Sequence, residues 1–107
     1  MTATTGVAEP YYGQPVNIGT SYNLPDITAG VLVKSGEGVL LSVTFNKPVA
    51  TGVITLYDGT STGGVVIATI TVPSSPQLTT LFYDVYFSTG LYVVIATQTE
   101  DITITYC

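Results

Sequence analysis

From residue 27 onward, short apolar runs alternate with clusters of Gly, Pro, Ser and Asp at intervals close to ten residues. Runs of this length that are rich in Val, Ile, Thr and Tyr are typical of β-strands, and the clusters are typical of turns. The pattern predicts seven strands, over residues 29–35, 39–45, 53–57, 65–72, 79–87, 91–97 and 102–106. This spacing predicts an all-β fold, a single β-sandwich of about seven to eight strands with Greek-key or jelly-roll connections.

Two connections have the composition of β-hairpin turns. Residues 35–38, Ser-Gly-Glu-Gly, join the first two predicted strands, and the small polar segment 58–64 separates the third from the fourth. Gly-containing turns between alternating strands favour antiparallel neighbours. We therefore expect each of these two pairs to form a hairpin.

Alternation of apolar and polar residues identifies the core-facing side of three predicted strands. The expected core positions are Val39, Leu41, Val43 and Phe45; Leu81, Tyr83, Val85 and Phe87; and Ile102, Ile104 and Tyr106. By contrast, residues 31–33, 65–67 and 92–95 are apolar at successive positions, and therefore on both faces of their strands. Because a two-layer sandwich buries one face of each sheet, we expect another subunit to cover some outer face.

Residues 1–26 have a different texture, with Pro, Gly and Tyr clusters such as Glu-Pro-Tyr-Tyr-Gly-Gln-Pro at 9–15. The prolines exclude a continuous helix and limit strand pairing to sheet edges. We predict an extended N-terminal arm over residues 1–26 and a β-sandwich domain over 27–107. Tyrosine offers amphipathic contact area at a small entropic cost, so Tyr11, Tyr12 and Tyr22 are the arm residues expected to bind a neighbouring subunit.

Charge is scarce, and this narrows the range of partners. Charged residues make up 8% of the chain, and Lys34 and Lys47 are its only basic residues against seven acidic ones. A net charge of -5 repels phosphate, which argues against a nucleic-acid partner. No stretch approaches the ~20 apolar residues of a membrane span, and the first residues lack a signal-peptide pattern, so we expect a soluble protein without a membrane partner. Low surface charge itself favours a homo-oligomer or a docked state.

The residues that carry most enzyme chemistry are missing. The chain has no His, and its single cysteine, Cys107, has neither an imidazole to activate it nor a second thiol to pair with. A free thiol fits synthesis in a reducing cytoplasm. The acidic residues fall mainly at predicted turns, where Asp58 and the pair at 100–101 are better explained as turn formers and solvated caps than as calcium ligands. We expect no catalytic residues, no metal site and no cofactor.

Aromatic residues gather in the second half of the chain, and two interpretations of them stay open. Phe82, Tyr83, Tyr86, Phe87 and Tyr92 are explained best by packing in the core or at a subunit interface, with Phe82 and Tyr86 as partner-binding candidates. The alternative is a platform on which sugars stack, although the chain has no Trp.

Residues 31–106 resemble a type of small virion protein encoded by tailed bacteriophages, the capsid decoration or cement proteins. The resembling stretches are Val-Leu-Val-Lys-Ser-Gly at 31–36, residues 49–60 with their Tyr-Asp-Gly-Thr turn, Phe-Ser-Thr-Gly-Leu-Tyr-Val-Val at 87–94, and Asp-Ile-Thr-Ile-Thr-Tyr at 101–106. The resemblance implies a β-sandwich that is bound in many copies to an icosahedral shell, often as a trimer, and that adds contacts without doing chemistry.

On this resemblance the expected partner is the major capsid protein, the expected location is the capsid surface of the virion, and the protein is made in the cytoplasm of a host bacterium. The alternatives are a tail, neck or head-fibre component, or a carbohydrate-binding adhesin module whose exposed loops, such as 58–64 and 73–77, carry recognition.

Overall fold

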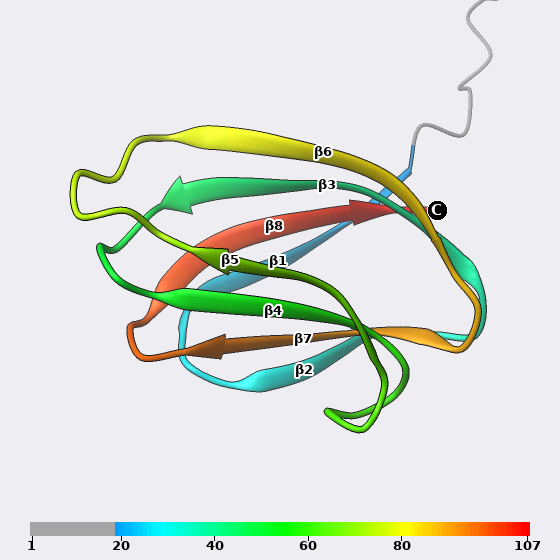
Figure 1. The fold of residues 1–107 in the computed structure, drawn as a ribbon. Helices are drawn as coiled ribbons and strands as arrows, with labels where there is room; N and C mark the ends of the chain where they lie inside the picture. The colour runs from blue at the N-terminus through cyan, green and yellow to red at the C-terminus, as the bar shows by residue number, and fades with distance from the viewer. Residues whose placement is uncertain (1–18) are drawn as a thin grey trace, which may run out of the picture.

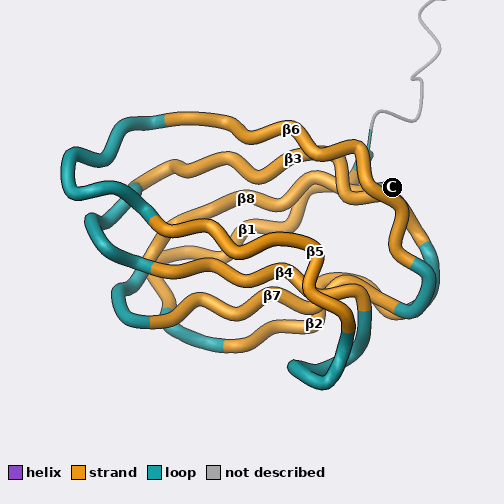
Figure 2. The backbone as a smooth tube through the Cα atoms, in the orientation of Figure 1, coloured by secondary structure: helices purple, strands orange, loops and turns teal. Residues whose placement is uncertain are grey.

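The computed structural model describes residues 19–107, which form two packed antiparallel β-sheets (Figure 1). The strands are β1 (Thr20–Ile27), β2 (Gly30–Ser35), β3 (Gly38–Lys47), β4 (Val53–Asp58), β5 (Val65–Thr71), β6 (Thr79–Phe87), β7 (Gly90–Ala96) and β8 (Glu100–Tyr106). Sheet A has the order β1-β8-β3-β6, and sheet B has the order β2-β7-β4-β5. The loops gather at the two ends of the sandwich (Figure 2). The predicted all-β sandwich is confirmed.

The connections are those of a jelly roll. β1 pairs with β8, β2 with β7, β3 with β6 and β4 with β5, so the chain forms a set of nested hairpins that is wrapped into two sheets. The hairpin predicted around residues 58–64 is therefore confirmed. The hairpin predicted over 29–45 is wrong, because β2 and β3 lie in different sheets. At the turn between them Gly36 has a positive φ of 89°, and its N–H donates to the Thr89 carbonyl oxygen at the facing turn.

The predicted boundary at residue 27 is too late. Residues 20–27 form β1, an edge strand that pairs with β8 from Thr20 opposite Tyr106 to Ile27 opposite Glu100. Pro25 suggested an arm because proline cannot sit in a central strand, but an edge strand has no partner on its second side. The pairing is irregular between Leu24 and Ile27, where Pro25 lies. Within the described residues, the sandwich thus begins at Thr20 rather than at residue 27.

A β-bulge in β3 changes which of its residues face the core. Leu40 pairs with Tyr106 of β8 and Ser42 pairs with Thr105, so Leu41 is an extra residue on β3. An extra residue reverses the alternation beyond it. Leu40, Val43 and Phe45 are therefore buried, whereas Leu41 and Val39, both predicted in the core, are only half-buried. The predicted core face of β8 is confirmed at Ile102 and Ile104, with Tyr106 packed against the core.

One apolar core lies between the two sheets. Its buried side chains come from β1, β2, β3, β4, β7 and β8, from Phe87 at the end of β6, and from Val72 directly after β5. Its buried members are Leu24, Val33, Leu40, Val43, Phe45, Ile54, Leu56, Val72, Phe87, Leu91, Val93, Ile95, Ile102 and Ile104. Leu81 and Tyr83 of β6 and Ile70 of β5 are partly buried against it. The sandwich is therefore less completely closed along its β5 and β6 side.

All four edge strands are irregular. Register shifts occur in β1 after Leu24, in β2 after Leu32, in β5 near Ile67 and in β6 between Phe82 and Val85. Asp84, at the β6 shift, has a positive φ of 53°. Bulged edges resist pairing with a strand from another molecule. The four edges therefore resist extension of either sheet by a strand from another molecule.

Candidate interaction surfaces

The outer face of sheet B is apolar and runs across all four of its strands. Cross-strand pairing places Leu32 of β2 opposite Tyr92 of β7, Tyr92 opposite Tyr57 of β4, and Tyr57 opposite Val66 of β5. Because their neighbours Val93 and Leu56 are buried in the core, these side chains point away from it. The apolar face, as we define it, consists of Leu32, Val53, Thr55, Tyr57, Val66, Thr69, Thr71, Tyr92, Val94 and Ala96.

This face confirms part of what the sequence predicted. The three segments that are apolar on both sides, 31–33, 65–67 and 92–95, belong to β2, β5 and β7, which all lie in sheet B. Val33, Val93 and Ile95 are buried in the core, and Leu32, Val66, Tyr92 and Val94 belong to the apolar face. The 73% exposed Val65, at the start of β5, belongs to neither. Leu32 is 41% exposed and Val66 is 52% exposed, and they lie at opposite edges of this face. Outward-facing apolar residues from all three segments therefore lie on the same outer face, that of sheet B.

Two tyrosines occupy the middle of the apolar face. The rings of Tyr57 and Tyr92 have centroids 6.3 Å apart and are inclined by 55°. Tilted pairs at this distance are favourable for aromatic rings. The Tyr92 ring extends over Gly30 of β2, where a Cβ atom would overlap its hydroxyl group. Gly30 therefore provides the space that lets Tyr92 lie along the sheet, while the 55° angle means that the two rings form no common plane.

The outer face of sheet A has the opposite character. Asn23 Nδ2 donates to Asp101 Oδ1 (3.0 Å) and Thr103 Oγ1 (3.2 Å), and Asn46 Nδ2 donates to the same two atoms (3.1 and 2.9 Å). Lys47 Nζ lies 3.5 Å from an Asp26 carboxylate oxygen, with both side chains exposed. Charged and amide groups therefore cover the outer face of sheet A over β1, β8 and β3, whereas its edge strand β6 exposes two aromatic side chains. No member of the apolar face of sheet B carries a charge.

Phe82 and Tyr86 lie on the outer side of β6, at the edge of sheet A. They are 79% and 59% exposed, as a partner-binding role requires. The Tyr86 hydroxyl donates to Glu37 Oε1 at 2.8 Å, and this bond raises the pKa of Tyr86 above 10.0. Tyr22, in contrast, lies in β1 and packs against the core, so it is not an arm residue. Tyr11 and Tyr12 lie outside the described residues.

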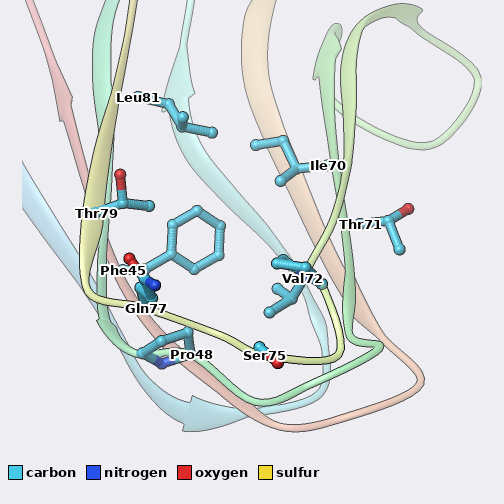
Figure 3. Close-up of a pocket in the computed structure, with 10 residues that line it drawn as sticks. Phe45, Pro48, Ile70, Thr71, Val72, Ser75, Gln77, Thr79 and Leu81 are labelled. Atoms are coloured by element: carbon cyan, nitrogen blue, oxygen red, sulfur yellow. The ribbon is translucent and has the colours of Figure 1, made fainter.

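An apolar pocket opens between the edge strands β5 and β6 (Figure 3). The Phe45 ring points into the gap between Leu81 of β6 and Ile70 of β5, and Val72 lies opposite it. The pocket has a volume of about 410 Å³, and its lining residues are Phe45, Pro48, Ile70, Thr71, Val72, Pro73, Ser75, Gln77, Thr79 and Leu81. A shallower hollow of about 500 Å³ shares Phe45 and Thr79 and reaches the 74% exposed Leu78. Sequence reasoning missed this pocket.

Asp58 joins the turns at one end of the sandwich. Its carboxylate accepts hydrogen bonds from the backbone N–H groups of Ser88 and Thr89, both at 2.9 Å, and from the Ser88 hydroxyl. These bonds stabilise the charged form and lower the pKa of Asp58 below 3.8. The sequence predicted a turn former at this position, and the structure shows that the turn it holds is the one between β6 and β7.

Glu100, predicted from the sequence to be a solvated residue of a turn, is instead a buried carboxyl group. It begins β8 and has no exposed surface. Oε1 accepts the Val49 N–H at 2.8 Å, while Oε2 has no hydrogen-bond partner. Oε2 lies against Gly52, where an added Cβ atom would overlap it. Burial disfavours the charged form and raises the pKa of Glu100 above 4.5.

Comparisons with known protein families, curated proteins and solved structures find no match for this chain. Among residues 19–107, no three His, Cys, Asp or Glu side chains lie close enough together to hold a metal ion. The same part of the chain contains no helix that is long and apolar enough to cross a membrane.

Proposed function

We propose that this protein is a non-enzymatic structural component of a tailed-bacteriophage virion that binds the outside of the capsid as a decoration or cement protein. The observation that carries the proposal is the contrast between the two outer faces of the sandwich. Sheet B presents ten uncharged residues centred on Tyr57 and Tyr92, whereas sheet A presents Asn, Asp and Lys on β1, β8 and β3 and exposes Phe82 and Tyr86 along its edge strand β6. A protein that docks by one face and meets solvent with the other requires this arrangement.

Charge favours sheet B as the docking face. The chain has a net charge of -5, and sheet A carries charged side chains on its outer face. Docking through sheet A would therefore require a partner surface with basic groups at matching positions. The apolar face has no such requirement, and burying Leu32, Val66 and the two tyrosines removes apolar surface from water. The resemblance of residues 31–106 to decoration proteins supports the major capsid protein as the surface on which this face docks.

The size of the face indicates how binding would work. Four strands spaced by about 4.8 Å and five or six residues in length cover roughly 400 Å². This area is about half of the ~800 Å² that each partner buries in a standard interface. One copy would thus bind a shell weakly. Many copies bound side by side and linked to one another would hold durably, because each further attachment occurs at high effective concentration.

The experiment measures binding to expanded, empty capsids of the phage whose genome encodes this chain. In the variant Leu32→Glu/Val66→Glu, two charges enter the apolar face at positions exposed enough to leave folding intact. We expect occupancy of the shell to fall at least tenfold with an unchanged unfolding midpoint. The matched control is Ser21→Glu, an exposed position of β1 in sheet A, which should bind like the wild type.

Equal binding by Leu32→Glu/Val66→Glu and the wild type would refute docking through sheet B. Failure of the wild type to bind the shell, together with cryo-electron microscopy density for it at the tail or neck, would refute the decoration role. The jelly roll is also a lectin fold. Binding to a glycan array that Tyr92→Ala abolishes would instead assign the adhesin alternative, although the inclined Tyr57 and Tyr92 rings do not form a flat sugar platform.

A further inference from the structure

The pocket between β5 and β6 is built to receive an uncharged, partly aromatic group. Its floor is formed by Phe45, Ile70, Val72 and Leu81, and none of its ten lining residues is charged. Its volume of about 410 Å³ lies within the range of small-ligand sites, roughly 300–1,000 Å³. Without a charged group the pocket offers nothing that would hold a phosphate, a carboxylate or a metal ion.

The rim of the pocket adds hydrogen-bonding groups to this apolar floor. Ser75, Gln77 and Thr79 lie at the opening and supply hydroxyl and amide groups. A tyrosine matches such a site, because its ring can occupy the apolar floor while its hydroxyl group reaches the polar rim. Prolines that flank the tyrosine in sequence would also favour binding, because an extended Pro-rich segment loses little conformational entropy when it binds.

This chain itself contains such a segment. Residues 9–15 read Glu-Pro-Tyr-Tyr-Gly-Gln-Pro, with two adjacent tyrosines between prolines and a single charge. The described sandwich begins beside this segment in sequence, at Gly19, which lies against Leu41 and Tyr106. Leu41 is near the start of β3, whereas Phe45 and Pro48 mark the pocket end of that strand.

The reach of the chain favours a pocket on another molecule. From Leu41 to Pro48 the strand direction covers about 24 Å, and a path from the sheet surface into the gap between the sheets adds to this. Tyr12 is seven residues from Gly19, and seven residues span at most about 25 Å when fully extended. Tyr12 could therefore enter the pocket of its own chain only if residues 12–19 were almost fully extended, and Tyr11 has one further residue of reach. The pocket of a neighbouring copy can lie closer to Gly19 in an assembly, and would then need no such extension.

We propose that Tyr11 or Tyr12 of one copy binds in the β5–β6 pocket of a second copy, so that the arm links neighbouring molecules. The contact joins two different surfaces, arm and pocket, and therefore closes into a ring when the rotation between copies allows it. A trimer is one such ring. This linkage goes beyond the proposed docking of sheet B, uses a different surface, and can be tested with no capsid present.

The first test identifies the contact in the full-length protein. Tyr12 is replaced by p-benzoylphenylalanine, and isotopically light and heavy copies are mixed before irradiation. We expect cross-linked peptides that join residue 12 of one isotope to pocket residues such as Ile70 or Leu81 of the other. Cross-links confined to one copy, or directed to Leu32 and Val66 on the apolar face, would overturn the proposal.

The second test measures the oligomeric state by sedimentation velocity. Tyr11→Ser/Tyr12→Ser removes the proposed ligand, and Gln77→Trp fills the pocket from an exposed rim position. Each should raise the dissociation constant of the oligomer at least tenfold. Thr62→Trp, an exposed position in the β4–β5 loop, is the matched control and should assemble like the wild type. A wild type that is monomeric at all concentrations, or a Gln77→Trp variant that assembles normally, would overturn the proposal.

Discussion

The buried carboxyl group of Glu100 should make this protein less stable as the pH rises from acid to neutral. The pKa of Glu100 is raised in the folded state by burial, so the folded protein holds the proton more tightly than the unfolded chain. Stability is therefore highest while Glu100 is protonated in both states, below its ordinary value of 4.5. It falls as the pH rises from 4.5 through the raised pKa, and stays low above it.

The hydrogen bonds of Glu100 set the size of the effect. Oε1 retains the Val49 N–H, and Oε2 has no partner in a site with no exposed surface. Oε2 is unpaired in both protonation states, but a buried charge without a hydrogen bond is more unfavourable than a buried neutral carboxyl group, so we expect ionisation to lower the free energy of unfolding by an amount on the order of 1–3 kcal/mol. Asp58 does not change the stability over this pH range. Because its pKa is lowered in the folded state, its stabilising contribution is fully present above 3.8 and is lost only as the pH falls below that value.

Urea unfolding, followed by circular dichroism at several pH values between about 4.5 and 7.5, measures this loss. The control is Glu100→Gln, which can still accept the Val49 N–H but cannot ionise. Its stability should vary much less over the same range. Wild-type stability that is constant or rises with pH in this range would refute the reasoning, as would an equal pH dependence in Glu100→Gln.

Urea unfolding also checks three further predictions. Gly52→Ala should lower the free energy of unfolding by about 1–3 kcal/mol, because the new methyl group overlaps Glu100 Oε2. The loss should be smaller in a Glu100→Ala background, where that overlap is gone. Equal losses in both backgrounds would argue against the contact. Phe45→Ala should cost about 3–5 kcal/mol because its ring is buried in the core. Phe82→Ala, at a 79% exposed position, should change stability by less than about 0.5 kcal/mol, and a similar cost at both positions would contradict their assigned environments. Asp58→Ala should cost about 1–2 kcal/mol at neutral pH through the lost bonds to Ser88 and Thr89. That difference should shrink as the pH falls through and below 3.8, because the neutral carboxyl group accepts weaker hydrogen bonds, and an undiminished difference in acid would contradict a role for the carboxylate charge.

The positions of β2 to β8 were predictable because their signals are local. Turn residues such as Asp58 and Gly59 interrupt the apolar runs, and β8 shows its inward face directly through Ile102 and Ile104. The prediction of an outward apolar surface was equally local, because it needed only successive apolar residues in 31–33, 65–67 and 92–95. These features depend on the period of the strand and on turn chemistry, which a single sequence records.

Strand partners were not predictable in the same way. A strand shows the same alternation whichever strand it pairs with, so the sequence could not show that β2 leaves β3 and pairs with β7. A bulge adds one residue without leaving a mark in the pattern, which is why Leu41 was wrongly placed in the core. Pro25 likewise suggested an arm, because its tolerance at an edge depends on where β1 lies in the sheet.

The sequence by itself determined that this is an all-β chain with few charges, no histidine and apolar surface in excess of what one core can bury. Tertiary structure decided where that excess lies. The nested pairing brought β2, β5 and β7 into one sheet, and so collected Leu32, Val66 and Tyr92 on a single face. It also opened the pocket beside Phe45 and buried Glu100, because both sites depend on strands and loops that are distant in the chain and adjacent only in the fold.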